Sequence, residues 1–388
     1  MEKETQKNLK FPDGFYWGAA TSAYQVEGGI NNCDWAKVYP AGIACDHYNL
    51  YEKDFDIAKS LGHNAHRFSI EWSRIEPEKG KFDEEEIEHY RNVIKALRGR
   101  GIEPFITLWH WTLPYWVAEK GGWEKRKTIK YFERYVEKII KELGDDIRFW
   151  ITLNEPDDIY SIFSYLKGIW PPQKKSIIKT IIVLNNLIKA HKKVYKIIHQ
   201  NNPSAKIGFA NNVVHYESYH NTLINNFLKF LVDYFWNFWF LNWTIKYNDF
   251  IGCNYYHNLI NYGFNKNLNM ETSDVGWEIC PTGIYCVLKT LKKYNLPIYI
   301  TENGIADAKD EKRERFIKDH LYWIHKAIQE GVDVRGYFYW SLLDNFEWDK
   351  GFWPRFGLVE VDYKTMNRKV RPSAYEYAKI CKENKLEI

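Results

Sequence analysis

Cysteine is scarce in this sequence, and its spacing suggests no metal site. The 388 residues include six cysteines, and none of them shows a paired C-x-x-C spacing. They are Cys33, Cys45, Cys253, Cys280, Cys286 and Cys381. Metal ligation therefore has little support, and buried free thiols in a reducing compartment are the better interpretation. We expect no metal, no cofactor and a cytoplasmic location.

A strong charge excess is also missing. The formal net charge is +4, and Lys and Glu interleave in stretches such as "EKRKTIKYFERYVEKIIKEL" (124–143). This pattern is typical of solvated helix faces, so we expect no nucleic-acid partner. The N-terminal "MEKETQKNLKFPDG" has no apolar core. We therefore expect no signal peptide, and a flexible tail over residues 1–10.

No uninterrupted apolar run is long enough to cross a membrane. The stretch "FLKFLVDYFWNFWFLNW" (227–243) is short for a span, and Lys229, Asp233, Asn237 and Asn242 interrupt it. We expect an aromatic helix packed on a core here, and no membrane span.

Aromatic residues, in contrast, are abundant, with 17 Trp, 28 Tyr and 22 Phe. Flat rings stack on sugars or bases as well as packing in a core, so this excess hints at a ligand without identifying it.

Eight apolar runs alternate with segments of helical period along the whole chain. They span residues 15–25, 64–72, 103–111, 147–155, 206–214, 249–256, 297–304 and 334–344. Near-continuous apolar runs are typical of strands buried on both faces. Eight of them without a linker favour one α/β domain over residues 1–388, a (β/α)8 TIM barrel. The alternative is a doubly wound sheet, but no glycine-rich phosphate turn follows the first run.

Polar and aromatic side chains stand where these runs end. The ends carry Gln25, Glu71-Trp72, His110-Trp111, Asn154-Glu155, Asn254-Tyr255-Tyr256, Glu302-Asn303 and Trp340. In a barrel, the carboxyl ends of the strands form the active-site rim. We therefore expect a polar bowl with aromatic walls, which suits a carbohydrate.

Several motifs resemble one known family. They are "FYWGAATSAYQVEG", "ACDHY", "RFSIEWSRIEP", "TLWHWTLP", "TLNEP", "DFIGCNYY", "GWEICPTGI", "ITENG" and "YFYWSLLDNFEWDKGFWPRFGLVEVDY". In this order they resemble glycoside hydrolase family 1, the retaining β-glycosidases. The resemblance implies the same barrel and a β-glucosidase that hydrolyses terminal β-glycosyl residues, with β-galactosidase or β-fucosidase activity as further options. The expected partner is a β-glycoside or oligosaccharide.

The resemblance also implies roles for single residues. Glu155 matches the general acid/base and Glu302 the nucleophile, while Arg67 and Tyr256 match the pair that contacts the nucleophile. The positions that match the sugar site are Gln25, His110, Asn154, Asn254, Glu347, Trp340 and Trp348, with Trp277 on the aglycone side.

The chemistry of two carboxyl groups agrees with these roles. Retaining hydrolysis needs one carboxylate that attacks and one carboxylic acid that protonates the leaving oxygen, about 5–5.5 Å apart. Arg67 beside Glu302 favours its ionised form. An apolar setting and the charge of Glu302 raise the pKa of Glu155.

The chain departs from the family before the expected sixth strand, where only "TIKYN" follows "YFWNFWFLNW". Residues left uncovered there, such as Phe238 and Trp239, are candidates for contact with a partner chain, so a homo-oligomer is one expectation. Three alternatives to hydrolysis of neutral glycosides stay open. They are a transglycosylase, a 6-phospho-β-glycosidase and a carbohydrate-binding pseudoenzyme.

Overall fold

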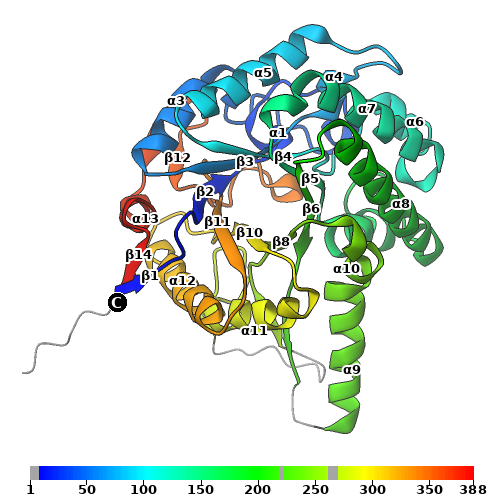
Figure 1. Ribbon diagram of the computed structural model, residues 1–388. Coiled ribbons are helices and arrows are strands. Elements are labelled where there is room, and N and C mark those ends of the chain that lie inside the picture. The colour runs from blue at the N-terminus through cyan, green and yellow to red at the C-terminus, as the bar shows by residue number, and fades with distance from the viewer. Residues whose placement is uncertain (1–7, 219–221, 261–269) are drawn as a thin grey trace, which may run out of the picture.

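Eight parallel strands close into one barrel in the computed structural model, which describes residues 8–218, 222–260 and 270–388 (Figure 1). In chain order the barrel strands are β2 (Tyr16–Ala20), β3 (Ala65–Ser69), β4 (Glu103–Thr107), β5 (Phe149–Asn154), β6 (Lys206–Asn212), β8 (Ile251–Asn254), β10 (Ile298–Asn303) and β11 (Val334–Trp340). Each predicted apolar run supplies one of them, and β11 pairs with β2 to close the circle. The predicted (β/α)8 barrel is confirmed.

Helices surround the barrel, and at least one follows each barrel strand (Figure 1). The α-helices are α1 (Ala23–Val26), α2 (Asp34–Val38), α3 (His47–Ser60), α4 (Trp72–Ile75), α5 (Glu84–Gly99), α6 (Tyr115–Glu119), α7 (Lys127–Leu143), α8 (Ile177–Asn201), α9 (Leu223–Asp233), α10 (Trp239–Thr244), α11 (Pro281–Leu291), α12 (Arg313–Gln329) and α13 (Pro372–Glu383). Two π-helical segments are η3 (Pro156–Leu166) and η4 (Tyr234–Phe238). The 3₁₀ turns are η1 (Gly122–Glu124), η2 (Gly144–Asp146), η5 (Ile245–Tyr247), η6 (Lys292–Tyr294) and η7 (Trp348–Lys350).

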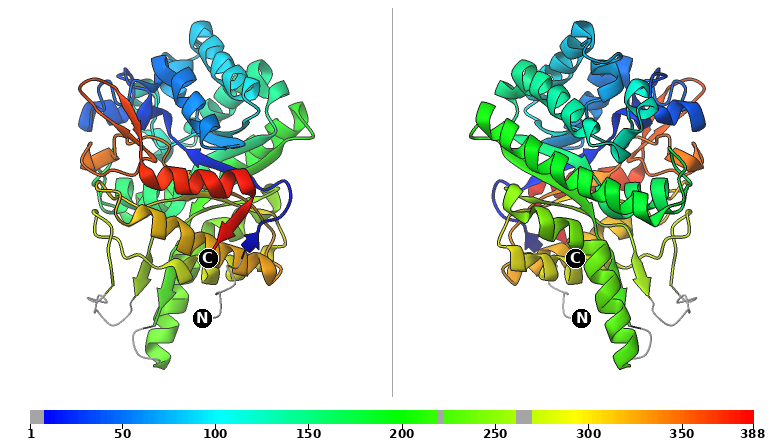
Figure 2. Two further views of the ribbon diagram at one scale, coloured as in Figure 1. Left: turned by 90° about the vertical axis from the view of Figure 1, so that its left-hand side faces the viewer. Right: turned by 90° about the vertical axis from the view of Figure 1, so that its right-hand side faces the viewer.

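Three short strand pairs lie outside the barrel. They are β1 (Asn8–Lys10) with β14 (Lys385–Glu387), β7 (His215–Glu217) with β9 (Asn258–Ile260), and β12 (Val359–Val361) with β13 (Arg368–Val370). The first pair brings the two ends of the described chain together (Figure 2). The predicted tail over residues 1–10 is therefore wrong for residues 8–10, because antiparallel hydrogen bonds hold them and Leu9 is buried. Residues 1–7 lie outside the described residues.

Aromatic side chains fill the interior of the barrel. Phe105 and Phe149 stack at 4.0 Å, and Tyr299 contacts both rings edge to face. Strand side chains alternate between the interior and the helices. On β3, Ala65 belongs to this interior cluster, so Arg67, two residues later, points inward as well. The packed interior leaves the carboxyl ends of the strands free to form a site.

The segment 227–243 is only partly the packed helix that we predicted. Phe240 and Leu241 of α10 are buried, whereas α9 has no buried residue and extends away from the barrel (Figures 1 and 2). Phe238 is also buried, so the expectation that it is uncovered is wrong, whereas Trp239 is only partly buried. Within the described ranges, none of the helices is both long and apolar enough to cross a bilayer.

Candidate active site

Glu155 and Glu302 stand at the carboxyl ends of β5 and β10, and both are buried. Glu155 follows the last residue of its strand with a positive φ of 42°, and Pro156 then begins η3. A positive φ is uncommon for a residue with a side chain and points to a functional constraint. Gly304, two residues after Glu302, allows β10 to pass close to β11, because a Cβ there would lie 1.8 Å from the Trp340 carbonyl oxygen.

Each carboxylate oxygen of Glu302 accepts a hydrogen bond from a different side chain. Arg67 Nη1 lies 2.5 Å from Oε1, and Tyr256 Oη lies 2.5 Å from Oε2. Arg67 is fully buried and also donates from Nε to Thr107 Oγ1. Charge-assisted bonds of this kind fix the carboxylate in one orientation.

Amide side chains connect the two carboxyl groups. Asn154 Oδ1 accepts hydrogen bonds from Arg67 Nη2 at 2.7 Å and from Asn254 Nδ2 at 3.2 Å. Asn254 Nδ2 also donates to Glu155 Oε1 at 2.7 Å. Asn254 is itself held by Thr301 Oγ1, which donates to Oδ1 at 2.6 Å. Side chains from four strands of the barrel, β3, β5, β8 and β10, therefore belong to one buried network.

His110 is a neutral imidazole in this network. Burial, together with the charge of Arg67, lowers its pKa well below the ordinary value. Asn154 Nδ2 lies 3.1 Å from Nε2 and donates to it, so the neutral ring carries its proton on Nδ1. Nδ1 is buried and has no hydrogen-bond partner in the described parts of the chain. This N–H is therefore a buried donor that the described side chains leave unsatisfied.

Gln25 and Glu347 form a second hydrogen-bonded group at the site. Gln25 Nε2 donates to Glu347 Oε2 at 3.2 Å and to the Phe346 carbonyl at 2.9 Å. Burial raises the pKa of Glu347 to about 8. The indole of Trp348 stacks near His110, with ring centroids 5.8 Å apart, and Trp340 lies 6.1 Å from the same ring.

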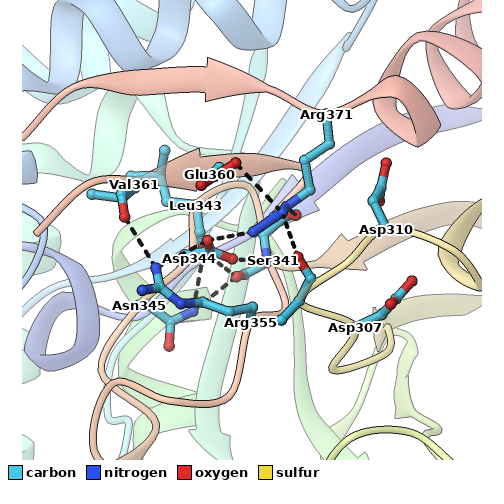
Figure 3. A network of polar contacts seen from close by, with 12 residues as sticks. Asp307, Asp310, Ser341, Leu343, Asp344, Asn345, Arg355, Glu360, Val361 and Arg371 are labelled. Carbon is cyan, nitrogen blue, oxygen red and sulfur yellow. Dashed lines mark hydrogen bonds and ion pairs between the residues drawn. The ribbon is translucent and has the colours of Figure 1, made fainter.

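A buried carboxylate fastens the loop that carries Glu347 and Trp348 (Figure 3). Asp344 Oδ2 accepts from Arg371 Nη2 at 2.6 Å and from Arg355 Nη1 at 3.2 Å. Its other oxygen accepts from the Gly357 backbone N–H at 2.9 Å. Next to it, Asn345 donates to Ser341 Oγ at 2.8 Å and accepts from Gln25. The loop is thus tied to Arg371 between β13 and α13, to the segment 355–357 and to the Gln25 side chain.

These groups surround a hollow at the carboxyl ends of the barrel strands. Eight of the twelve predicted site residues line it, namely Glu155, Glu302, His110, Tyr256, Trp277, Trp340, Glu347 and Trp348. The other four, Gln25, Arg67, Asn154 and Asn254, lie behind them and hold them through the hydrogen bonds above. The structure therefore brings all twelve together.

The hollow also has walls that the sequence analysis did not identify. They include Ile159, Phe163, Trp170, Asn212, His257 and Phe356, whereas Trp111 was already expected at the rim. Asn212 ends β6, so its place at a strand end was a usable signal. Ile159 and Phe163 lie on η3 and Trp170 lies beyond it, on a connection without a motif of its own.

The proton of the carboxyl pair belongs on Glu155. Burial raises the pKa of both groups, and the charge of Glu302 raises that of Glu155 further. At Glu302 the guanidinium of Arg67 and the hydrogen bond from Tyr256 oppose the effect of burial. Two buried carboxyl groups of this kind titrate as a pair, with one proton shared between unequal sites.

Comparison with known proteins identifies the family. A model of glycosyl hydrolase family 1 matches residues 7–251 and 245–386. The chain belongs to this family. Beta-glucosidase A of Thermotoga maritima is 36% identical over 442 aligned positions, which cover 97% of this chain and 99% of the relative. A beta-galactosidase of Sulfolobus acidocaldarius is 31% identical, with 97% and 96% covered. The solved structure of a beta-glycosidase from Pyrococcus horikoshii has a TM-score of 0.93 at 39% identity and covers 98% of this chain and 97% of that chain.

As a member of family 1 the chain is a retaining β-glycosidase, as the resemblance implied. Its alignment with the T. maritima relative is longer than its own 388 residues, so the relative contains residues that this chain lacks. The family match divides into two segments that overlap at residues 245–251, from the end of α10 to the start of β8. This place is where we predicted a shortened connection, and η5 alone bridges it.

Proposed function

We propose that this family 1 enzyme is a β-glucosidase that also accepts β-galactosides or β-fucosides, with Glu302 as nucleophile and Glu155 as acid/base. The assignment rests on one observation: the two carboxyl groups accept hydrogen bonds from different kinds of donor. Glu302 receives one donor on each oxygen, from Arg67 and Tyr256. Within the described parts of the chain, the Glu155 carboxyl group accepts a hydrogen bond only from the neutral amide of Asn254. The first group is built to be an anion and the second to hold a proton.

In the first step, an oxygen of Glu302 bonds to the anomeric carbon as the bond to the glycosidic oxygen breaks. Glu155 gives its proton to that oxygen, and the aglycone leaves as a neutral alcohol. The product is a glycosyl ester of Glu302, so one negative charge has disappeared beside Glu155. The pKa of Glu155 then falls, and its carboxylate can remove a proton from water. The water oxygen bonds to the anomeric carbon, Glu302 leaves, and two inversions give net retention.

The remaining groups suit a neutral sugar. Gln25 and Glu347 present an amide and a carboxyl group for sugar hydroxyls, and Trp340 and Trp348 offer apolar ring faces. A carboxyl group at this position disfavours a phosphorylated sugar, since a phosphate prefers cationic donors. The T. maritima and S. acidocaldarius relatives are named for glucosides and galactosides, which supports both as substrates. Trp277 packs against Tyr256 at 5.4 Å and is placed to contact the aglycone.

The decisive experiment compares Glu302→Ala and Glu155→Ala with the wild type on aryl β-glucosides, galactosides and fucosides. Both variants are expected to lose at least about 1,000-fold in kcat/KM, because each removes a group that acts in the transition state. Azide restores turnover in Glu155→Ala with a β-glycosyl azide and in Glu302→Ala with an α-glycosyl azide. Glu137→Ala, on an exposed position of α7, is the matched control. Inversion by the wild type, or unchanged activity of Glu302→Ala, would contradict the assignment.

We further propose that residues 1–388 form one catalytic domain in the cytoplasm. All six cysteines are free thiols and five of them are buried, which supports a reducing compartment. The β1–β14 pair joins the two ends of the described chain, which supports a single unit. One cooperative calorimetric transition is expected, and two resolved transitions would contradict it.

A further inference from the structure

Helix α9 turns its polar side toward its own chain. Asn225, Lys229 and Asp233 recur every four residues and form one stripe along the helix. Burial lowers the pKa of His215 on β7, and the charges of Lys229 and Asp233 are near enough to shift it in opposite directions. Asp233 also accepts a hydrogen bond from Asn237 at 2.6 Å. The stripe therefore faces β7.

A buried asparagine holds helix α9 in this orientation. Asn237 is 2% exposed and exchanges two hydrogen bonds with the backbone of Val214, of 2.9 and 2.8 Å. Its own carbonyl accepts from Asn211 Nδ2. Two of the polar residues that interrupt the aromatic run, Asp233 and Asn237, are thus the ones that attach this segment to the barrel.

The opposite side of α9 is apolar and exposed. We call it the α9 face; it consists of Leu223, Ile224, Phe227, Leu228 and Phe230. Leu223 is 90% exposed, Ile224 72% and Phe230 63%. Soluble monomers rarely expose a contiguous apolar surface of more than a few hundred Å². In the described parts of the chain nothing covers the α9 face, and the family match divides into two overlapping segments shortly after it, at residues 245–251.

We propose that the α9 face binds the α9 face of a second copy of this chain, which gives a dimer with twofold symmetry. The face contains no charged residue, since Lys229 and Asp233 lie on the other side, so two identical faces meet without repulsion. Side chains spaced at i, i+4 and i+7 form the ridge that packs one helix against another. Because α9 extends beyond the barrel, two barrels leave each other room (Figure 2).

The size of the face is sufficient for such a dimer. Four of the five side chains are more than half exposed and Leu228 is 37% exposed. At on the order of 150 Å² for a fully exposed side chain of aromatic size, they offer about 500 Å² per copy. Two copies together reach about 1,000 Å², the lower limit of a specific interface. We therefore expect a reversible dimer that forms at micromolar concentration.

The test measures the association state of the full-length enzyme by sedimentation velocity over a range of concentrations. The wild type is expected to pass from monomer to dimer. Phe230→Glu is expected to weaken association at least tenfold, because in the dimer it sets a carboxylate of each copy within an apolar interface. Ile178→Glu is the matched control, since Ile178 is a 68% exposed apolar residue on α8, and it should leave association unchanged. Activity on an aryl glucoside and the thermal midpoint verify that each variant is folded.

A second readout uses bismaleimide cross-linking. Phe227→Cys should give a covalent dimer and Ile178→Cys should not, against a background in which only Cys286 of the native thiols is partly exposed. A wild type that stays monomeric at high concentration would overturn the proposal, as would dimers that persist unchanged in Phe230→Glu. Flotation of the monomeric enzyme with phosphatidylglycerol vesicles would assign the face to a bilayer instead.

Discussion

Arg67 and Glu302 form an ion pair with Nη1 2.5 Å from Oε1, and their side chains are only 1% and 5% exposed. Arg67 Nη2 donates to Asn154 Oδ1 and its Nε donates to Thr107 Oγ1. One planar guanidinium therefore holds three side chains in place. A buried charge pair is weak evidence for stability, because desolvation offsets the attraction. The ion pair instead fixes the orientation of the Glu302 side chain, since Glu302 cannot turn away from the hollow without leaving a buried cation unpaired.

Arg67→Lys is expected to retain the charge and lose this geometry. A lysine cannot bond to Glu302, Asn154 and Thr107 together, because it lacks the planar fork. We expect kcat/KM on an aryl glucoside to fall by about 100-fold or more. Steady-state kinetics measure this, with thermal unfolding as the control for folding. Activity within twofold of the wild type would show that the charge alone is sufficient.

The pH dependence should be bell-shaped. Glu302 must be ionised, and burial raises its pKa, so kcat/KM rises as pH increases through that value. Glu155 must be protonated, and its pKa is raised well above the ordinary value by burial and by the charge of Glu302. Activity therefore falls again at higher pH.

The fall at high pH should be absent in Glu155→Gln. The measurement uses a dinitrophenyl glycoside, whose leaving group needs no proton. The rise at low pH should remain, since Glu302 is unchanged in this variant. A high-pH limb that persists in Glu155→Gln would assign it to another group, for example Glu347, whose pKa is raised to about 8.

Asp344→Asn should impair both stability and sugar binding. It leaves Arg371 without its buried counter-charge, and removal of one partner of such a pair lowers the free energy of unfolding by about 3 kcal/mol. KM should rise because the loop of Glu347 and Trp348 loses an attachment. Asp333→Asn is the matched control, since its pair with Arg335 is half exposed on both sides and should contribute little. Denaturant titration and glucoside kinetics compare the two, and equal effects would contradict a special role for Asp344.

Gly304→Ala should disturb the junction of β10 and β11. A Cβ at this position would lie 1.8 Å from the Trp340 carbonyl oxygen, so one of the two strands must move. We expect a loss of about 2 kcal/mol in the free energy of unfolding and a larger proportional loss of activity, because Glu302 is two residues away. Gly99→Ala in α5, where nothing lies within 4 Å, should be neutral or stabilising. A thermal midpoint of Gly304→Ala equal to that of Gly99→Ala would show that the β10–β11 junction accommodates the added Cβ without loss of stability.

Much of the site follows from local sequence. A strand buried on both faces must be apolar until it reaches the rim, so polar residues at its end mark the rim directly. Glu155 and Glu302 are recognisable for this reason, and so are His110 and Trp340. Arg67 could also be anticipated, because an inward-pointing arginine inside a barrel requires an anion, and Glu302 supplies it.

Contacts between distant segments could not be anticipated in this way. Periodicity shows that a helix has an apolar side, but it does not say whether the same chain covers that side. For this reason Phe238 was expected to be exposed and is buried, while Phe230 of the same aromatic run is exposed. The pairing of residues 8–10 with residues 385–387 is likewise invisible locally. The alternation of strands and helices and the polar residues at the strand ends could be predicted from the sequence, because short-range patterns encode them. The pairing of the chain ends and the outward turn of α9 depended on which surfaces meet, and tertiary packing alone decides that.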